Sequence, residues 1–475
     1  MSTDDFSLLS ALSGPTIVAR LNRLPITSLH RRATVAIGLG LFFDIYEVFL
    51  AGVLGSVLSH QFHLAGSALA LLLASAFLGM FLGALTLGRL ADRIGRRHAF
   101  LLSLSVYSVF SLIGAFSVGP VMLVVSRFFA GLGIGAEPPI SDTYLSDLLP
   151  PKQRGKYMAW AYTLSFVGVP LAGFLGHWLV PVAPFGFEGW RWMFVIGAFG
   201  AVVVFALRAG LPESPRWLES VGRTSEADAV VARFEQQARA SGDPLPEPAP
   251  KEPGQTGRAR VRELFVPPYR RRTLMMTVFH LFQTWGYYGF GTLVPIVLVA
   301  KGYSIVDSLL FSSMTFVGYP IGSALSLTVV ERIERKHLVI GAALGMAAFG
   351  VTFGLATSTA AIVVCGFLYT ILSNVFSNAY HIYQAEVFPT RLRATATSGT
   401  YSLSRLSAGL MPFILLPLLH THGAGALFSV VAAALVVVAL DIAVLGPRTT
   451  GRGLESVNET LTCPPHDRAP TGQAR

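Results

Sequence analysis

The sequence predicts an all-α membrane protein with twelve transmembrane helices in two pseudo-symmetric bundles of six. The first observation is composition: of 475 residues, 52% are hydrophobic and only 13% are charged, whereas soluble proteins average about 25% charged residues. The second is an internal duplication. The charged run Asp92–His98 recurs 239 residues later as Glu331–His337. A second motif, with Tyr144 in the first copy and Tyr383 in the second, keeps the same offset. Two motifs at one offset indicate two related halves.

The individual crossings follow from runs of apolar residues. A membrane-spanning helix needs roughly 20 predominantly apolar residues. Twelve such segments lie near residues 33–58, 66–88, 98–117, 120–146, 157–180, 190–208, 272–299, 305–330, 338–357, 360–384, 396–419 and 423–446.

These segments divide the chain into five regions. Residues 1–32 form an N-terminal segment and 33–208 the first six-helix bundle. Residues 209–271 form a linker loop, 272–446 the second bundle, and 447–475 a tail that we expect to be disordered. Within the linker, Glu226–Ala240 resembles a short surface helix, and the Pro- and Gly-rich stretch Asp243–Gly257 is expected to be mobile.

The distribution of basic residues predicts the orientation in the membrane. The net charge is +10, yet all but four of the 36 Lys and Arg residues fall in alternate loops on one side, or in the termini. The exceptions are Arg127, Arg191, Lys301 and Arg405. Basic residues are enriched in cytoplasmic loops. The sequence therefore predicts a multi-pass protein of the cell (plasma or inner) membrane with the N-terminal segment, the linker and the tail in the cytoplasm.

Several classes of function are disfavoured by the sequence. Cys365 and Cys463 are the two cysteines, and they support neither a disulfide nor a metal site. No Walker motif or nucleophile–base set is apparent. We therefore expect no cofactor, no metal, no enzymatic activity and no nucleic-acid partner. The expected partners are a small-molecule substrate, protons and the lipid bilayer, and we expect a monomer.

Ionisable residues inside the predicted helices are candidates for proton coupling. Such a residue at the bilayer centre costs at least about 2.5–3.5 kcal/mol, so its presence needs a reason. Asp44 and Glu47 are three apart and share one helix face. Because close carboxylates repel, one of them is expected to hold a proton near neutral pH. Arg127 is the expected ion-pair partner, although it could instead contact an anionic substrate. The alternative for the acids is a buried pair satisfied by a neighbouring base or hydroxyl.

Aromatic, amide and basic residues inside the helices are candidates for substrate binding. Aromatic faces with a few amides suit a flat or ring-bearing solute, and Arg405 could bind a substrate carboxylate. The alternative for many of these residues is core packing. The candidates are Tyr46, Gln283, Trp285, Tyr288, Asn374, Asn378 and Arg405.

Acids and bases recur at the predicted cytoplasmic helix ends of both halves, which suggests a gate. Forked arginine–carboxylate pairs between the halves would hold the cytoplasmic side shut. The alternative is surface solvation, where an exposed pair contributes about 0–1 kcal/mol. The candidates are Asp92, Arg93, Arg96, Asp147, Arg154, Glu213, Arg216, Glu331, Arg332, Glu386 and Arg393.

The loop motifs also resemble those of a known family. Gly88–Arg97 is similar to the loop signature of the major facilitator superfamily. Leu211–Leu218 and Ala385–Ala394 resemble motifs of its sugar-porter and organic-ion branches. The runs Phe42–Glu47 and Trp285–Tyr288 look more like the bacterial metabolite:proton symporters, which are related to the niacin, aromatic-acid and synaptic-vesicle-protein branch. The resemblance covers about residues 20–446.

This resemblance implies a secondary active transporter that works by alternating access. The expected function is proton-coupled import of an aromatic or heterocyclic carboxylate, such as nicotinate or a benzoate. A sugar:proton porter and a drug/proton antiporter are alternatives, and a transporter-like solute sensor is a rival of another class. The glutamine-rich helix 7 signature of sugar porters is replaced here by Phe282–Tyr288, which disfavours a hexose. The short tail carries no signalling domain, which disfavours a sensor.

Overall fold

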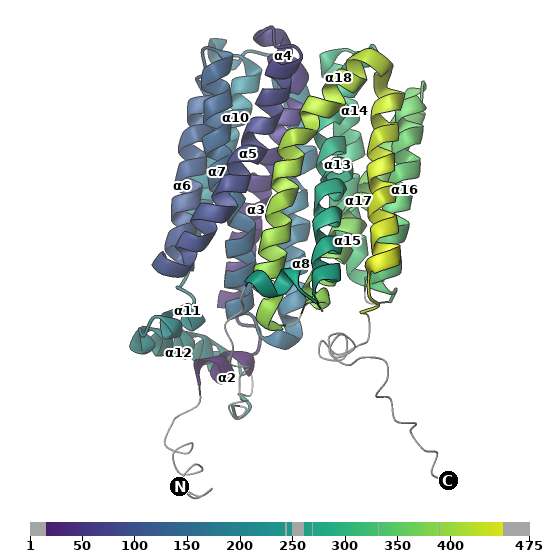
Figure 1. Ribbon diagram of the computed structural model, residues 1–475. Coiled ribbons are helices and arrows are strands. Elements are labelled where there is room, and N and C mark those ends of the chain that lie inside the picture. Colours follow the sequence, from purple (N-terminus) through teal and green to yellow (C-terminus); the bar gives the residue numbers. More distant parts are fainter. Residues whose placement is uncertain are drawn as a thin grey trace, which may run out of the picture. The chain divides into compact units, whose positions relative to one another are not determined.

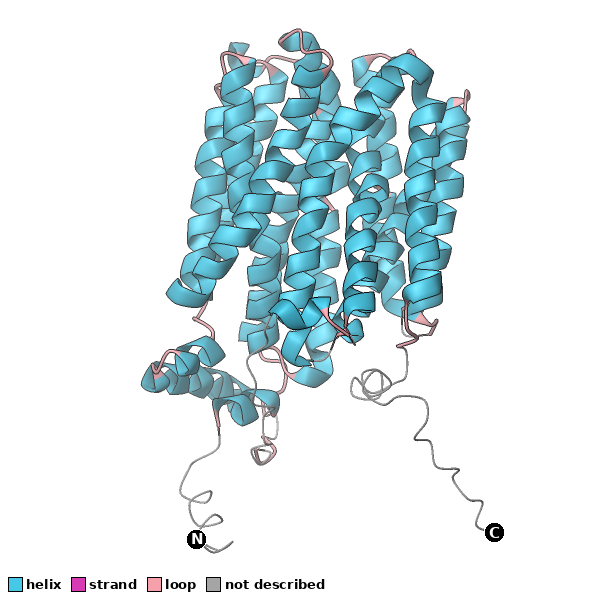
Figure 2. Ribbon diagram, viewed as in Figure 1, coloured by secondary structure: helices cyan, strands magenta, loops and turns pink. Residues whose placement is uncertain are grey.

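The structure is a computed structural model that describes residues 16–242, 245–248, 261–267, 269–330, 332–388 and 390–449. Within these ranges all regular secondary structure is helical (Figure 2). Most of the stretch expected to be mobile, and the tail from residue 450, lie outside the described residues. The chain divides into two compact units, Met1–Gly254 and Gln255–Arg475.

The helices of the first unit form an antiparallel bundle, with three short helices beyond one end of it (Figure 1). The bundle contains α3 (Ser28–Val53), α4 (Gly55–Gln61), α5 (Ser67–Ile94), α6 (Arg96–Ala115), α7 (Pro120–Leu148), α8 (Pro151–Phe166), α9 (Gly168–Leu179), the 3-10 turn η1 (Pro184–Gly186) and α10 (Gly189–Ala209). The short helices are α2 (Ile17–Asn22), α11 (Pro215–Ser220) and α12 (Thr224–Ala240). The end that carries them, predicted to be cytoplasmic, is called the inner end.

The second unit is a bundle built in the same way. Its elements are the 3-10 turn η2 (Val261–Phe265), α13 (Arg270–Ala300), α14 (Ile305–Phe316), α15 (Gly318–Val329), α16 (Arg335–Leu355), α17 (Thr359–Val387) and α18 (Thr390–Leu445).

The helix lengths account for the twelve predicted crossings. Ten helical segments among the described residues are long and apolar enough to cross a membrane. Helix α13, with 31 residues, is long enough but carries more polar residues and is not among them. Helix α18 has 56 residues, or about 84 Å of helix, whereas a bilayer core is about 30 Å thick. It is broken at Gly423, whose φ of +79° suits glycine, so it supplies two crossings.

The first crossing begins earlier than the apolar pattern indicates. Helix α3 starts at Ser28, five residues before the predicted boundary at 33. The reason is a cap that hydropathy does not report. The Nδ1 atom of His30 accepts the backbone N–H of Thr27 at 3.0 Å, and so satisfies an otherwise unpaired donor at the helix start.

A charged cluster ties α2 to α12 at the inner end. The carboxylate of Glu235 accepts from Nε of Arg20 at 3.1 Å and from Nη2 of Arg23 at 2.7 Å. Arg20 also donates to Asp228 at 2.7 Å. These contacts are stronger than ordinary surface pairs because one buried carboxylate receives two guanidinium groups. They fix the N-terminal segment to the linker.

The contact predicts a pH-dependent release of α2. The hydrogen bond from Arg20 lowers the pKa of Glu235 below its ordinary value of 4.5. A lowered carboxyl pKa contributes stability that is fully present above the ordinary value and is lost as the pH falls through the lowered one. We expect Glu235→Gln to speed hydrogen exchange of the Ile17–Asn22 amides at neutral pH. The wild type should show the same loss only below about pH 4.5, with exchange rates corrected for intrinsic pH dependence.

The matched control is Glu226→Gln. Glu226 lies on the same helix, but it pairs with Arg223 at an exposed position. Exchange at α2 should therefore stay at the wild-type rate in this variant. Equal protection of α2 in the Glu235 and Glu226 variants would show that the cluster does not hold the N-terminal segment.

Candidate functional site

A closed ion pair joins α3 and α7 inside the first unit. The guanidinium of Arg127 donates Nη1 to the carboxylate of Glu47 and Nη2 to the Glu47 carbonyl oxygen at 2.8 Å. Ser111 donates to the same carboxylate at 3.1 Å. Arg127 is 1% exposed and Glu47 is fully buried. Charge-assisted bonds of this kind are strong when water is excluded, so this pair is a structural joint between the two helices.

A second buried ion pair lies nearer the inner end and was not predicted. Arg208 on α10 donates Nη1 to the carboxylate of Glu137 on α7, and its other nitrogens donate to the carbonyls of Ala36 and Ile37 on α3 at 3.3 and 3.2 Å. Its guanidinium also lies over the Phe100 ring, 4.4 Å from the centroid. Arg208 was counted among the bases of the cytoplasmic loops, but its side chain is 1% exposed and lies inside the bundle.

Asp44 is the acid left over by these two pairs. It lies on α3 between the pairs and is 3% exposed. Its Oδ2 atom has no hydrogen-bond partner among the described residues. The first unit therefore buries the carboxyl groups of Asp44, Glu47 and Glu137 against only two guanidinium groups. An unpaired buried carboxylate is costly, and neutralisation by a proton removes that cost.

The second unit contains a buried cation, Arg405. Arg405 on α18 donates Nη1 to the hydroxyl of Tyr288 and Nη2 to that of Tyr401 at 2.7 Å. The two rings lie 4.9 and 5.1 Å from the guanidinium carbon. Arg405 is 5% exposed, and no carboxylate in the described part of the chain lies within ion-pair distance of it. This site can therefore accept an anion.

A histidine–glutamine chain borders the cation, and two of its members, His280 and Gln384, were not assigned from sequence. His280 Nε2 lies 3.0 Å from Gln384 Oε1, and Gln384 Nε2 lies 3.2 Å from His381 Nδ1. The Tyr401 ring is 5.6 Å from His280 and 5.8 Å from His381. These residues add polar and aromatic surface beside Arg405. The sequence spacing of His381 and Gln384 hints at one helix face, but their approach to His280 is a tertiary contact.

The other predicted substrate residues have protein partners in this structure. Trp285 Nε1 donates to Ser407 at 3.1 Å. Asn374 donates to the Tyr319 carbonyl at 2.5 Å, and Asn378 donates to Ser326 at 2.6 Å. Their contact with a substrate stays a prediction.

Two further candidates are buried. Gln283 is 1% exposed, and its Oε1 has no hydrogen-bond partner among the described residues. Tyr46 is fully buried in the first unit and donates its hydroxyl to the Met193 carbonyl at 2.9 Å. Tyr46 therefore packs α3 against α10 in this structure.

The gate residues of the first unit form a cluster around Glu213. Its carboxylate accepts the backbone N–H groups of Arg96 at 3.0 Å and of Arg97 at 3.1 Å, at the start of α6. Gly95 has a φ of +95°, a conformation that favours glycine, and a Cβ there would also lie 2.3 Å from this carboxylate. Ser214 donates to Asp147 at 2.7 Å. An acid at a helix N-terminus satisfies free N–H groups and complements the helix dipole.

Where the remaining gate candidates form ion pairs, the partner belongs to the same unit. Arg96 contacts Asp92 at 2.9 Å, and Arg335, another base of the expected gate, contacts Glu386 at 3.2 Å. Arg154 donates to the Leu149 carbonyl at 3.2 Å, Arg216 donates to Asn22 at 3.0 Å, and Arg93 and Arg332 are exposed. Glu331 and the side chain of Arg393 lie outside the described residues. Pairing between the two halves stays a prediction.

The Glu213 cluster predicts an asymmetry among the gate acids. Glu213→Gln should lower the thermal midpoint of the purified protein, because a capping carboxylate contributes about 0.5–2 kcal/mol. Asp92→Asn should leave the midpoint unchanged, since the Asp92 side chain is 71% exposed. Differential scanning fluorimetry compares the two, and equal midpoints would contradict a capping role for Glu213.

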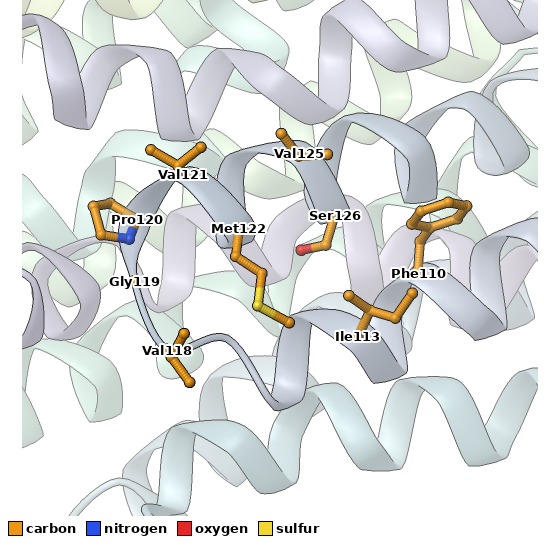
Figure 3. A pocket seen from close by; sticks show the side chains of 9 residues that line it. All are labelled: Phe110, Ile113, Val118, Gly119, Pro120, Val121, Met122, Val125 and Ser126. Carbon is orange, nitrogen blue, oxygen red and sulfur yellow. The ribbon is translucent and has the colours of Figure 1, made fainter.

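One hollow in the first unit is lined almost wholly by apolar side chains. It has a volume of about 500 Å³ and is formed by the end of α6, the start of α7 and their connection (Figure 3). Ser126 is its one hydroxyl-bearing residue, and Val118 and Val121 on its rim are largely exposed. A surface of this kind suits lipid chains better than a polar solute.

Comparisons with known proteins agree with this architecture. Residues 33–461 match the family described as Sugar (and other) transporter. The Bacillus subtilis protein YyaJ, named for metabolite transport, is 33% identical over 82% of this chain and 86% of its own length. The niacin transporter NiaP of Acinetobacter baylyi is 28% identical over 93% of this chain and 99% of its own length. The gentisate transporter of Corynebacterium glutamicum is 28% identical over 82% of each chain.

The fold also matches solved structures. The xylose transporter XylE of Escherichia coli, in a partially occluded inward-open conformation, superposes with a TM-score of 0.73 at 20% identity, over 90% of this chain and all of that one. The chain is thus a secondary transporter of the major facilitator superfamily, a multi-pass membrane protein and not an enzyme. It belongs to the sugar (and other) transporter family.

Proposed function

We propose that this transporter imports a small aromatic or heterocyclic carboxylate, of the nicotinate or benzoate type, together with protons. The observation that carries the proposal is Arg405, a buried guanidinium whose partners are two tyrosine hydroxyls rather than an acid. A buried charge without a counter-ion is costly. A substrate carboxylate would supply the missing charge and could bind the guanidinium with both oxygens.

The surroundings of Arg405 support a ring-bearing substrate. The rings of Tyr288, Tyr401, Tyr380 and His381 lie close together in the second unit, and Tyr380 stacks on His381 at 4.4 Å. Flat aromatic faces contact a flat ring with little loss of conformational freedom. The names of two relatives, a niacin transporter and a gentisate transporter, point the same way, because both solutes are aromatic acids.

Asp44 supports coupling to protons. It is the buried acid of the first unit that has no arginine assigned to it, so its charge can be removed by a proton and restored by its release. The outward-open and inward-open states of a transporter expose a central site to opposite sides of the membrane. A carboxyl group that must be protonated while it is buried therefore links proton binding to the conformational change.

Uptake by the purified protein in liposomes tests the proposal. Labelled nicotinate should accumulate above equilibrium when the outside is acidic, and unlabelled benzoate and gentisate should compete. Xylose should not compete, because a sugar offers no charge to Arg405. Accumulation of xylose with no effect of aromatic acids would favour the sugar:proton porter instead. Uptake that ignores the pH gradient would exclude proton coupling.

The orientation belongs to the same proposal. We infer that both termini and the linker face the cytoplasm, from the one-sided distribution of basic residues. Reporter fusions after Arg154 and Lys251 should report the cytoplasm, and fusions near Glu188 and Gly302 the outside. The opposite pattern in either half would overturn the orientation.

A further inference from the structure

The buried charges of the first unit form a ladder along one face of α3. Gly40, Asp44 and Glu47 are spaced by four and three residues, so they lie above one another on the same side of the helix. Glu47 forms an ion pair with Arg127 at the outer end of this row. Gly40 marks the step nearer the inner end, about one helical turn, or 5.4 Å, from Asp44.

Arg208 occupies the step at Gly40. A Cβ placed on Gly40 would lie 1.8 Å from Nη2 of Arg208, so the guanidinium rests directly against the α3 backbone at this point. The same guanidinium holds Glu137. Arg208 therefore contacts α3 one helical turn from Asp44, and the charges of Arg208 and Glu137 both act on Asp44.

Asp44 and Glu137 each have a carboxyl oxygen without a hydrogen-bond partner among the described residues. These atoms are Asp44 Oδ2 and Glu137 Oε2, and both are buried. Pro138 and Pro139 follow Glu137 directly and interrupt the hydrogen-bond ladder of α7 there. Arg208 therefore contacts one of two carboxyl groups that each keep an oxygen without a partner among the described residues.

We propose that Asp44, Glu137 and Arg208 form a triad that binds one proton, in which Arg208 pairs with whichever carboxylate is ionised. The inference rests on the proposed proton coupling. Two carboxylates and one guanidinium carry a net charge of −1, and one bound proton makes the buried triad neutral. The structure has Arg208 on Glu137, which corresponds to the proton being on Asp44.

The triad gives the proton a defined exit. When protonated Asp44 releases its proton to water, its carboxylate competes with Glu137 for the guanidinium one turn away. Binding of a proton by either carboxyl group returns Arg208 to the other. The charged and titratable groups around Asp44 are Glu137 on α7, Arg208 on α10, Glu47 on its own helix, and Tyr107 on α6. Arg127 is engaged by Glu47.

Infrared spectroscopy of the purified protein tests the triad without a substrate. A protonated carboxyl group has a C=O stretch distinct from that of a carboxylate. We expect the wild type at neutral pH to show such a band, and Asp44→Asn to remove it. In Glu137→Gln, Asp44 is the one carboxyl group of the triad left for Arg208, so Asp44 should stay ionised and the same band should vanish.

Asp142→Asn is the matched control, because Asp142 lies on α7 like Glu137 but accepts a hydrogen bond from Tyr162 at 2.8 Å. The Asp44-dependent band should remain.

A second variant covers the case in which Glu137→Gln does not fold. Arg208→Gln removes the guanidinium, so two protons are needed for neutrality, and the protonated carboxyl signal should increase about twofold by the same count of charges. An Asp44-dependent band that persists in Glu137→Gln, or a signal unchanged in Arg208→Gln, would overturn the triad.

Failure of the triad can be told apart from failure of the proposed function. If Asp44→Asn abolishes gradient-driven uptake while Glu137→Gln keeps both uptake and the band, proton coupling stands and the triad is wrong. If the bands behave as expected while uptake in Asp44→Asn still follows the pH gradient, the triad stands and the coupling role of Asp44 is wrong.

Discussion

Asp44→Asn is expected to abolish accumulation of substrate driven by a pH gradient while leaving exchange of substrate across the membrane intact. The reason is that asparagine is neutral and cannot release a proton, whereas exchange needs no net proton movement. Liposomes loaded with unlabelled nicotinate measure exchange, and empty liposomes with an acidic exterior measure accumulation. The expected result is uptake that reaches equilibrium and goes no further.

Glu47→Gln provides the contrasting variant. Glu47 is held by Arg127 and Ser111, so its removal should act on stability first. Leaving a buried guanidinium unpaired costs about 3–5 kcal/mol. We expect reduced yield or a lower thermal midpoint, with any folded protein still coupled. Gradient-driven accumulation that survives in the Asp44→Asn, Glu47→Gln double variant would place the coupling site elsewhere.

Arg405→Gln should cause the largest loss of substrate affinity. If the guanidinium is the counter-ion of a buried carboxylate, its removal costs at least about 2 kcal/mol, which is about thirtyfold in Kd. Arg405→Lys keeps the charge but loses the planar fork, so it should lie between the wild type and Arg405→Gln. Calorimetric titration with nicotinate measures the change.

The neutral analogue nicotinamide separates charge recognition from general damage. It has the same ring without the carboxylate, so its weak binding should differ little between wild type and Arg405→Gln. Arg223→Gln serves as a control for loss of a basic residue, since Arg223 is exposed and pairs with Glu226. An equal loss of affinity for nicotinate and nicotinamide would show that Arg405 supports the fold and does not bind the carboxylate.

The sequence predicts those parts of the structure that depend on periodicity and local spacing. Twelve crossings follow from apolar runs, and the shared face of Asp44 and Glu47 follows from their spacing of three. The contact between Arg127 and Glu47 joins residues 80 apart in sequence. It could be anticipated because a buried base needs an acid, and few acids lie at membrane depth.

The contacts that escaped prediction depend on tertiary packing. Arg208 stands at the end of an apolar run, where a long basic side chain ordinarily extends to the interface. Only the packing of α10 against α3 shows that it turns into the bundle, where Gly40 leaves room for it. The approach of His280 to Gln384 links residues 104 apart. No periodic pattern encodes such a distance.

The clamp between α2 and α12 has a consequence for synthesis of the chain. Arg20 and Glu235 are separated by 215 residues, and ribosomes add about 5–20 residues per second, so the acid emerges roughly 10–40 s after the arginine. All six crossings of the first unit are made in that interval. Until α12 emerges, Arg20 and Arg23 lack Glu235 and are available to anionic lipid headgroups. The clamp can therefore close only once the whole first unit has been translated, which makes it a late step in biogenesis.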